Sequence, residues 1–503
     1  MNHWIVAPIL LPLLTAIILV AAKGATLRVQ RVLSLAAALA SLGLAALLVS
    51  LAAEGGVQVY RLGDWPYAYG ITLVLDRLSA MMVLLTAALA LPSLLYAAQG
   101  ADAAGRHFHA LFQLQLMGIN GAFLTGDLFN LFVFFEILLI ASYGLLLFGG
   151  GKARSRAGIQ YVVLNLAGSS LFLIAVGLIY GATGSLNMAD IAVRVAAAGP
   201  EQETLLRTGA FLLVVVFGLK AAAVPLAFWL PNAYAVASAP VAALFAIMTK
   251  VGVYAILRVF TLVFGLDGVD IAGAVAAWLI PVGLATMVIG NAAAMIETRL
   301  RRQIGWLLIG SVGIMLVVVG LLDVQSIASG LYYLIHSTLL AAGLFLLADL
   351  VARQRGAASD HLQAALPIAQ ATFLGILFFV GATAYAGLPP FSGFLGKAII
   401  LQATREAALA PWIWTVVLVT SMFAVIGLAR AGSRLFWNVL PGVSQARPAS
   451  FAAVLPAILL IASSPLLVGL AGPVVEYVTA TAVQIGQPHL YVEQVLGRVA
   501  TGQ

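Results

Sequence analysis

Apolar stretches of about 20 residues follow one another along almost the whole chain, and this pattern constrains the fold more than any other feature. An α-helix of that length spans the hydrocarbon core of a bilayer. Transmembrane helices are predicted near residues 4–22, 30–52, 73–98, 107–125, 127–149, 157–181, 205–224, 240–264, 272–296, 303–321, 326–352, 366–388, 412–436 and 449–482. The sequence therefore predicts an all-α, polytopic membrane protein with about 14 transmembrane helices.

The composition excludes several other classes of protein. Charged residues make up 9% of the chain, whereas they make up about 25% of an ordinary soluble domain. The chain has no cysteine, which excludes disulfides, thiolate-ligated iron–sulfur clusters and thiol catalysis. It shows no phosphate-binding loop, no dinucleotide fingerprint and no cluster of metal ligands. We therefore expect no cofactor, no metal and no nucleic acid partner. A transporter driven by an ion gradient or a partner protein is expected, rather than an enzyme.

The basic residues of the connecting loops are divided unequally between the two sides of the membrane. One side has Lys23, Arg28, Arg31, Arg106, Lys152, Arg154, Arg156, Arg299, Arg301, Arg302, Arg353, Arg355, Arg430, Arg434 and Arg447. The other side has only Arg61, Arg77, Arg194, Arg207, Arg405 and Arg498. Because Lys and Arg concentrate on the cytoplasmic side, we expect both termini on the outer side, which requires an even number of helices.

Five ionisable residues lie within the apolar stretches, namely Glu136, Lys220, Lys250, His336 and Lys397. A charge near the bilayer centre costs at least about 2.5 kcal/mol, and residues of this kind commonly form proton or ion pathways. Simpler roles stay open for three of them. The carboxyl group of Glu136 could be satisfied by one hydrogen bond and serve packing alone. The side chain of Lys250 could extend to the membrane interface. His336 could serve merely to bridge two helices by hydrogen bonds.

Two further charged residues have simpler explanations from their positions. Arg258 lies near a helix end, where its long side chain is expected to extend to the interface. Asp127 lies where one predicted helix ends and the next begins. An N-cap is therefore at least as well supported for Asp127 as a functional role.

Proline interrupts the helical pattern once in each half of the chain. Pro225 follows Lys220, and Pro389 and Pro390 precede Lys397. Two shorter apolar pieces accompany these prolines, near residues 228–239 and 391–404. Paired broken helices indicate an ion site at the midplane of an inverted-repeat transporter, although one lysine precedes its break and the other follows.

Buried lysines can take part in proton transfer without a cofactor. Burial disfavours the ammonium form, and a nearby carboxylate favours it. A buried lysine whose acidic neighbour approaches or withdraws is therefore a proton acceptor of adjustable affinity. Backbone carbonyls freed at the helix breaks could hold waters or a cation between such groups.

Four stretches resemble the antiporter-like subunits shared by respiratory complex I and the Mrp-type multisubunit Na⁺/H⁺ antiporters, and in particular the D-type subunits (Mrp, Pha or Mnh). They are Gly126–Tyr143, Phe217–Asn232, Lys250–Tyr254 and Gly387–Lys397. The resemblance extends over essentially the whole chain. It implies a bacterial inner membrane, fourteen helices, two inverted repeats made of helices 4–8 and 9–13, and breaks in helices 7 and 12. The implied divisions are 1–106, 107–264, 265–436 and 437–503.

The resemblance also implies the roles of single residues. Glu136 corresponds to the glutamate of helix 5, Lys220 and Lys250 to the lysines of helices 7 and 8, His336 to the histidine of helix 11, and Lys397 to the ionisable group of helix 12. Many relatives have a lysine five residues after that histidine, where this chain has Ala341. The link between the two half-channels is therefore expected to depend more on His336 and water.

The leading hypothesis is a proton-translocating subunit of a cation/proton antiporter that works with other subunits of an Mrp-type complex in the lipid bilayer. The alternative keeps the fold but places the chain in complex I or a membrane-bound hydrogenase. Lys397 argues against the complex I subunit that has a glutamate at this position. A third hypothesis, a non-transporting scaffold, does not explain the buried lysines. The passage of Na⁺ through this subunit rather than a partner stays open.

Overall fold

The computed structural model describes residues 2–22, 24–266, 270–444 and 446–497. Lys23 and Arg498, which were part of the charge count, lie outside these ranges. Within them the chain is almost entirely helical. Eleven helical segments of the described part are long and apolar enough to cross a membrane, and α1 (Ala7–Ala21) and α15 (Ala371–Ala386) are shorter apolar helices. The prediction of an all-α, polytopic membrane protein is confirmed.

A β-hairpin joins the second and third helices at one end of the molecule. It connects α2 (Leu27–Gly55) to α3 (Arg77–Ala97) and consists of β1 (Gln58–Arg61) and β2 (Thr72–Leu75), with Val59 opposite Val74. The predicted start of a helix at residue 73 is therefore wrong. The sequence Thr-Leu-Val-Leu pairs as a strand, and α3 begins only after Asp76, whose carboxylate accepts a hydrogen bond of 2.8 Å from the Ser79 amide.

The next part of the chain holds the first broken helix. Its elements are α4 (Phe108–Leu124), α5 (Leu128–Leu147), α6 (Lys152–Thr183), α7 (Met188–Ala196), α8 (Pro200–Ala221), α9 (Trp229–Val236), α10 (Ala239–Phe245), α11 (Met248–Arg258) and the π-helical turn η4 (Val259–Val263). The shorter piece predicted near 228–239 is α9. The helix predicted over 240–264 is present, but it consists of the segments α10, α11 and η4.

The remaining helices contain the second break. They are α12 (Ile271–Ile296), α13 (Leu300–Gly320), α14 (Val324–Gln354), α15, α16 (Ser392–Ala403), α17 (Ala410–Gly432), α18 (Phe451–Gly469), α19 (Ala471–Ile485) and α20 (Pro488–Leu496). The shorter piece near 391–404 is α16. The single helix predicted over 449–482 is wrong, because Leu470 leaves the helical conformation (φ −102°, ψ 18°) and separates α18 from α19.

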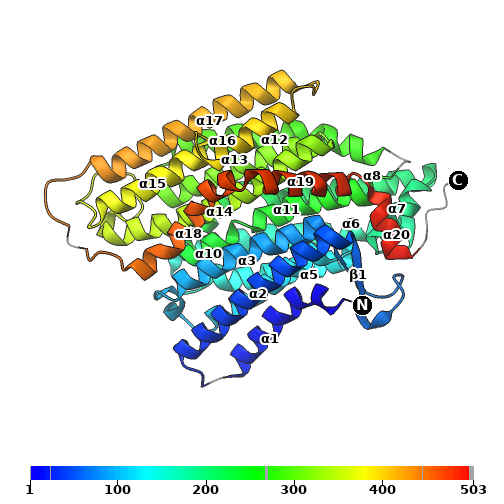
Figure 1. Cartoon of the computed structure of the whole chain (residues 1–503), viewed down its shortest axis with the longest axis horizontal. Helices are drawn as coiled ribbons and strands as arrows, with labels where there is room; N and C mark the ends of the chain where they lie inside the picture. Colours follow the sequence, from blue (N-terminus) through cyan, green and yellow to red (C-terminus); the bar gives the residue numbers. More distant parts are fainter. Residues whose placement is uncertain (1, 23, 267–269, 445, 498–503) are drawn as a thin grey trace.

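The helices differ strongly in how much of their surface other helices cover. Every residue in the apolar window of Ala239–Val263 is buried, and so are 94% of those in α13 and α14, compared with 33% in α2 and in Ala410–Trp437. Figure 1 shows α1 and α2 along one long edge, α17 along the opposite edge, and α11, α13 and α14 between them. Helix α20 and the start of α1 lie toward the same end of the bundle (Figure 1). The central helices are therefore the ones that can hold charges away from lipid.

Candidate functional site

The first broken helix places a lysine at an interrupted helix end. Helix α8 ends at Ala221, the next residue Ala222 has a left-handed conformation (φ 59°), and α9 begins only at Trp229. Pro225 lies within this gap. Lys220 occupies the last turn of α8 and is 5% exposed. A positive charge at this position is favoured by the partial negative charge of the helix C-terminus.

Lys220 is held by an asparagine of the neighbouring helix α6. Its Nζ donates hydrogen bonds to the side-chain oxygen of Asn165 at 3.2 Å and to the Asn165 carbonyl at 3.4 Å. The two helices approach closely here. A Cβ on Gly168 would lie 2.5 Å from Cδ2 of Leu219 and 3.8 Å from Nζ of Lys220. Gly168 therefore makes the contact between α6 and Lys220 possible.

Glu136 contacts the same face of α6 rather than the lysine itself. Its carboxylate is partly buried and accepts a hydrogen bond from the Ser169 hydroxyl. Among the residues that the structure describes, Glu136 and Lys220 form no direct ion pair. Ser169 and Asn165 are four residues apart, so they lie on adjacent turns of one helix face. Glu136 and Lys220 therefore bind to the same face of α6, at side chains about one turn apart.

Lys250 is completely enclosed by protein. It lies on α11, is 0% exposed, and donates a hydrogen bond of 3.1 Å from Nζ to the hydroxyl of Ser311 on α13. The Ser311 hydroxyl in turn donates to the Leu308 carbonyl at 2.6 Å. Extension of Lys250 to the interface, one of the roles left open by the sequence, is excluded by this burial.

The second broken helix holds Lys397. Helix α15 ends at Ala386, Gly387 follows with φ +84°, and α16 begins at Ser392, after Pro389 and Pro390. The Nζ of Lys397 reaches back over this gap and donates to the Ala386 carbonyl at 2.7 Å. It also donates to the hydroxyl of Ser421, on α17, at 2.8 Å.

His336 joins three helices near the same break. Its ring is 1% exposed, and Nδ1 lies 2.8 Å from the hydroxyl of Ser392, the first residue of α16. That hydroxyl lies 2.8 Å from the hydroxyl of Ser464 on α18. The structure thus places His336 at a junction of α14, α16 and α18. Ala341, about one and a half turns further along α14, is also fully buried.

A small cavity separates the Lys250 end of this arrangement from Lys397. Its polar lining consists of Asn291, Ser311, Tyr333, Tyr385, Lys397, Thr420 and Ser421. It offers about 20 Å³ for the centre of a water molecule, which is roughly the space that one buried water needs. Lys397 and Ser311, the partner of Lys250, therefore line the same cavity.

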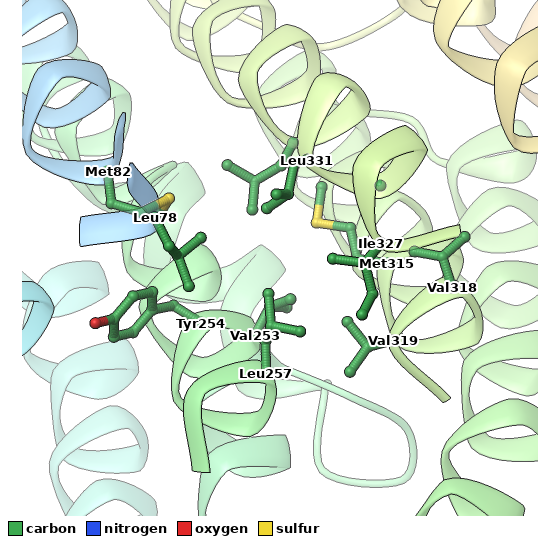
Figure 2. A pocket seen from close by; sticks show the side chains of 12 residues that line it. Leu78, Met82, Val253, Tyr254, Leu257, Met315, Val318, Val319, Ile327 and Leu331 are labelled. Atoms are coloured by element: carbon green, nitrogen blue, oxygen red, sulfur yellow. The ribbon is translucent and has the colours of Figure 1, made fainter. Parts of the chain in front are cut away.

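A second small cavity also borders α13 and α14 but has a different character. Figure 2 shows it between α3, α11, α13 and α14, lined by hydrocarbon side chains such as Leu78, Val253 and Met315. Its one hydroxyl group belongs to Tyr254 and donates to the Phe123 carbonyl at 2.6 Å. This apolar cavity provides packing space and offers no partner for a proton in transit.

Arg258 corrects an expectation from the sequence. Its guanidinium does not extend to the interface, because it is buried and binds both carboxylate oxygens of Asp76 at 2.8 and 2.6 Å. Its Nε also donates to the Tyr254 hydroxyl at 3.2 Å. The charge of Arg258 therefore secures α11 to the start of α3.

Asp127 caps helix α5. Its side-chain oxygen accepts a hydrogen bond of 2.7 Å from the amide of Asn130. Burial at this connection between α4 and α5 raises the pKa of Asp127 to about 6. The N-cap role left open by the sequence is present in the structure.

Sequence reasoning missed the neutral partners of the charged residues. Asn165, Ser169, Ser311, Ser392 and Ser421 all lie in apolar helices. A search for ionisable residues cannot detect them, and hydroxyl groups are common in membrane helices. In the described part of the chain, no group of three His, Asp or Glu residues is arranged to hold a metal ion.

Comparison with known proteins decides the family. Residues 125–425, which contain all five ionisable residues, match the family model described as "NADH:quinone oxidoreductase/Mrp antiporter, TM". The chain belongs to the NADH:quinone oxidoreductase/Mrp antiporter family. The predicted family is confirmed by this match.

Individual members of this family resemble the chain over its full length. It is 41% identical to the D-type subunit of a probable K⁺/H⁺ antiporter of Rhizobium meliloti, with 100% of this chain and 99% of the relative covered. It is 36% identical to the D-type subunit of a Na⁺/H⁺ antiporter of Bacillus subtilis, with 99% and 100% covered. The fold matches a chain in the structure of the Mrp complex from Dietzia sp. with a TM-score of 0.88 and 27% identity, covering 99% of this chain and 100% of that one.

Proposed function

We propose that the chain is a proton-translocating subunit of a multisubunit antiporter that exchanges a monovalent cation for protons. The observation that carries this proposal is the burial of Lys220 and Lys250, each hydrogen-bonded to a neutral side chain of a neighbouring helix. A buried ammonium without a fixed counter-ion is costly, and a neutral partner leaves the lysine free to lose its proton. The family assignment supports the same function.

The proposed proton route contains Glu136, Lys220, Lys250, His336 and Lys397. The lysines act as sites that alternate between ammonium and amine, and the helix breaks at Pro225 and at Pro389 and Pro390 supply unpaired carbonyls beside two of them. At the second break, Lys397 already binds such a carbonyl, that of Ala386. The negative charge of Glu136 adjusts the affinity of Lys220 for its proton by electrostatic attraction.

Transport is proposed to depend on the other subunits of an Mrp-type complex. The names of two relatives specify K⁺ and Na⁺ respectively, so both cations belong in the test. We further propose two inverted repeats, residues 107–264 and 265–436, flanked by 1–106 and 437–503. The occurrence of one broken helix in each repeat supports this division.

The experiment is cation/proton exchange in everted membrane vesicles that contain the complete antiporter complex. With Lys397→Ala, exchange of Na⁺ or K⁺ for protons should fall to the background of vesicles without the complex. Lys152→Ala is the matched control, because Lys152 is an exposed lysine at the start of α6. Full exchange by an assembled Lys397→Ala complex would refute the proposed route and favour the scaffold hypothesis.

The proposed membrane is the bacterial inner membrane, with both termini on the outer side. The excess of Arg and Lys on one set of loops supports this orientation. Because the chain has no cysteine, single cysteines can report the topology. Tyr69→Cys and Val443→Cys change side chains that are 87% and 84% exposed and that lie on opposite sides in this arrangement. In intact cells, an impermeant maleimide should label the Tyr69→Cys variant and leave the Val443→Cys variant unlabelled. The reverse pattern would show that the orientation is the opposite of the one proposed.

The alternative is a proton-pumping subunit of complex I or a membrane-bound hydrogenase. The family model includes NADH:quinone oxidoreductase subunits, so the fold alone does not separate the two assemblies. Purification of the native complex does so. Co-purification of soluble flavin and iron–sulfur subunits would support the alternative, and membrane subunits alone would support the antiporter.

A further inference from the structure

Two arginines at the end of helix α17 form no ion pair within the described part of the chain. Arg430 lies in the last turn of α17, and Arg434 follows four residues later in the π-helical turn η6 (Ser433–Trp437). The Nη2 of Arg430 donates to the backbone carbonyl of Glu297 at 2.6 Å, and the Nη1 of Arg434 donates to that of Leu362 at 3.4 Å. Both acceptors are neutral. The two guanidinium groups are therefore fixed in position without a counter-ion.

The carboxylate beside these arginines is already engaged by other groups. The side chain of Glu297 is 7% exposed, and one of its carboxylate oxygens lies 3.2 Å from the Nε of Arg302 on α13. The other oxygen accepts a hydrogen bond of 2.8 Å from the amide of Thr298. We call Arg302, Arg430 and Arg434 the arginine site. Its three positive charges surround one carboxylate, so the site has an excess of positive charge.

Exposed apolar side chains continue from the arginine site along α17. Ile426 and Met422 lie four and eight residues before Arg430, so all three side chains lie along one face of the helix. Ile426 is 42% exposed and Met422 is 57% exposed. Trp437, which is 81% exposed, lies three residues after Arg434. Tryptophan concentrates at the membrane–water interface, which places the arginines at the depth of the lipid headgroups and the apolar face at the depth of the acyl chains.

Helix α12 forms the neighbouring part of this surface. A Cβ on Gly427 of α17 would lie 3.0 Å from Cα of Met295, so the two helices pack closely here. Ile296, the last residue of α12, is 67% exposed. Only 39% of the apolar window of α12 and 33% of that of Ala410–Trp437 are buried, and Figure 1 shows α17 along an outer edge of the bundle. The surface is therefore charged at one end and hydrocarbon along the rest of its length.

We propose that the arginine site binds the phosphate group of an anionic phospholipid, and that an acyl chain of this lipid lies along Ile426 and Met422. Guanidinium groups bind phosphate oxygens through paired, charge-assisted hydrogen bonds. Basic pockets between transmembrane helices on the cytoplasmic side are suited to anionic headgroups. A soluble phosphate would use the arginines alone, whereas the apolar face that continues from them matches a lipid. Because Arg302 belongs to α13 and the other two arginines follow α12 and lie at the end of α17 in space, the bound lipid would hold these helices together.

The test measures lipid binding by the purified, complete antiporter complex. Native mass spectrometry counts the bound molecules of phosphatidylglycerol, the anionic probe, and of phosphatidylcholine, the neutral one. The wild type should bind phosphatidylglycerol preferentially. The double variant Arg430→Gln/Arg434→Gln should bind it about tenfold more weakly, because the neutral amides lose charge-assisted hydrogen bonds to the phosphate. Lys152→Gln/Arg156→Gln is the matched control, since it removes two exposed positive charges at the start of α6, and it should bind like the wild type.

A second measurement is independent of any folding defect in the double variant. The melting temperature of each complex is compared in phosphatidylcholine vesicles with and without phosphatidylglycerol. Addition of phosphatidylglycerol should raise the melting temperature of the wild type and of the control, because a ligand that binds the folded state stabilises it. The double variant should gain nothing, whatever its melting temperature in phosphatidylcholine alone. Glycerol 3-phosphate, which has a phosphate group but no acyl chain, should not displace phosphatidylglycerol from the wild type.

The other outcomes would overturn the inference. Undiminished binding of phosphatidylglycerol by the double variant would exclude the arginine site, and an equal loss in the control would show a general effect of charge. Displacement by glycerol 3-phosphate would indicate a site for soluble phosphates. Loss of another subunit from the double variant would assign these arginines to a protein interface. None of these results bears on the proposed proton route, because the route contains none of the three arginines.

Discussion

The Nζ of Lys397 donates a hydrogen bond of 2.7 Å to the carbonyl oxygen of Ala386, the last residue of α15. The lysine lies on α16 and thus reaches back across the break that separates the two helices. The end of α15 has an unpaired carbonyl and a partial negative charge, and the ammonium satisfies both. The second broken helix is therefore held by one of the groups proposed to carry protons.

The first prediction concerns Gly387 in that break. Gly387→Ala should destabilise the complex by about 1–2 kcal/mol, because the residue has a left-handed conformation (φ +84°). The new Cβ would also lie 2.8 Å from Cδ of Lys397, so exchange should slow as the lysine moves. Thermal melting of the purified complex and vesicle exchange measure the two effects. Gly177→Ala, in α6 with open space around it, is the control; equal effects would contradict the argument.

The second prediction concerns the carboxylate of Glu136. Glu136→Gln should abolish or strongly reduce exchange in an assembled complex, because the amide cannot favour the ammonium form of Lys220. Glu136→Asp, with a shorter reach, should be intermediate. Ser169→Ala removes the hydroxyl that donates to Glu136 and should lower the rate severalfold. Ser170→Ala changes the exposed neighbouring serine and should have no effect. Normal exchange by Glu136→Gln would exclude this role.

The third prediction tests the neutral partner of Lys220. Asn165→Asp places a carboxylate near the lysine, whose Nζ is now 3.2 Å from the asparagine oxygen. A permanent ion pair would hold the proton on Lys220, so exchange should fall about tenfold or more. Asn165→Ala, which leaves the lysine without this partner, should reduce exchange less. If Asn165→Asp exchanged faster than Asn165→Ala, the need for a neutral partner would be disproved.

The fourth prediction concerns the buried pair of Asp76 and Arg258. Asp76→Asn should destabilise the protein by about 3–5 kcal/mol, because it leaves the guanidinium buried without its counter-ion. Glu203→Gln removes one partner of an ion pair whose side chains are much more exposed and should cost about 0–1 kcal/mol. Thermal melting of the purified complex compares the two. A similar small shift in both variants would contradict the structural role of Asp76.

The fifth prediction uses the pKa of Asp127. Burial raises it from 3.8 to about 6, so in this window the folded protein retains a proton that the unfolded chain releases. Stability contributed by Asp127 is therefore greatest below about pH 4 and is lost as the pH rises through about 6. Asp127→Asn keeps the N-cap acceptor for the Asn130 amide and should remove this decrease. Melting temperatures measured between pH 4 and 7 test this prediction. If they fell with pH equally in the wild type and in Asp127→Asn, the decrease would not come from Asp127.

Much of the fold was predictable because its causes are local. A run of apolar residues long enough to cross a bilayer has to be helical there, since the lipid offers no hydrogen bonds to the backbone. Pro225, Pro389 and Pro390 interrupt helices at their own positions, where α8 and α15 are followed by gaps. The start of α3 and the division at Leu470 were missed because they depend on strand pairing and on packing at helix ends.

The sequence by itself determined which residues are charged within the membrane and which helices are broken. Only the tertiary structure decided what each charge meets. Lys220 binds Asn165, 55 residues away, and Arg258 binds Asp76, 182 residues away. Ser311, which binds Lys250, lines the same cavity as Lys397. These contacts depend on how helices distant in the sequence rotate and pack against one another, and hydropathy and local periodicity do not contain that information.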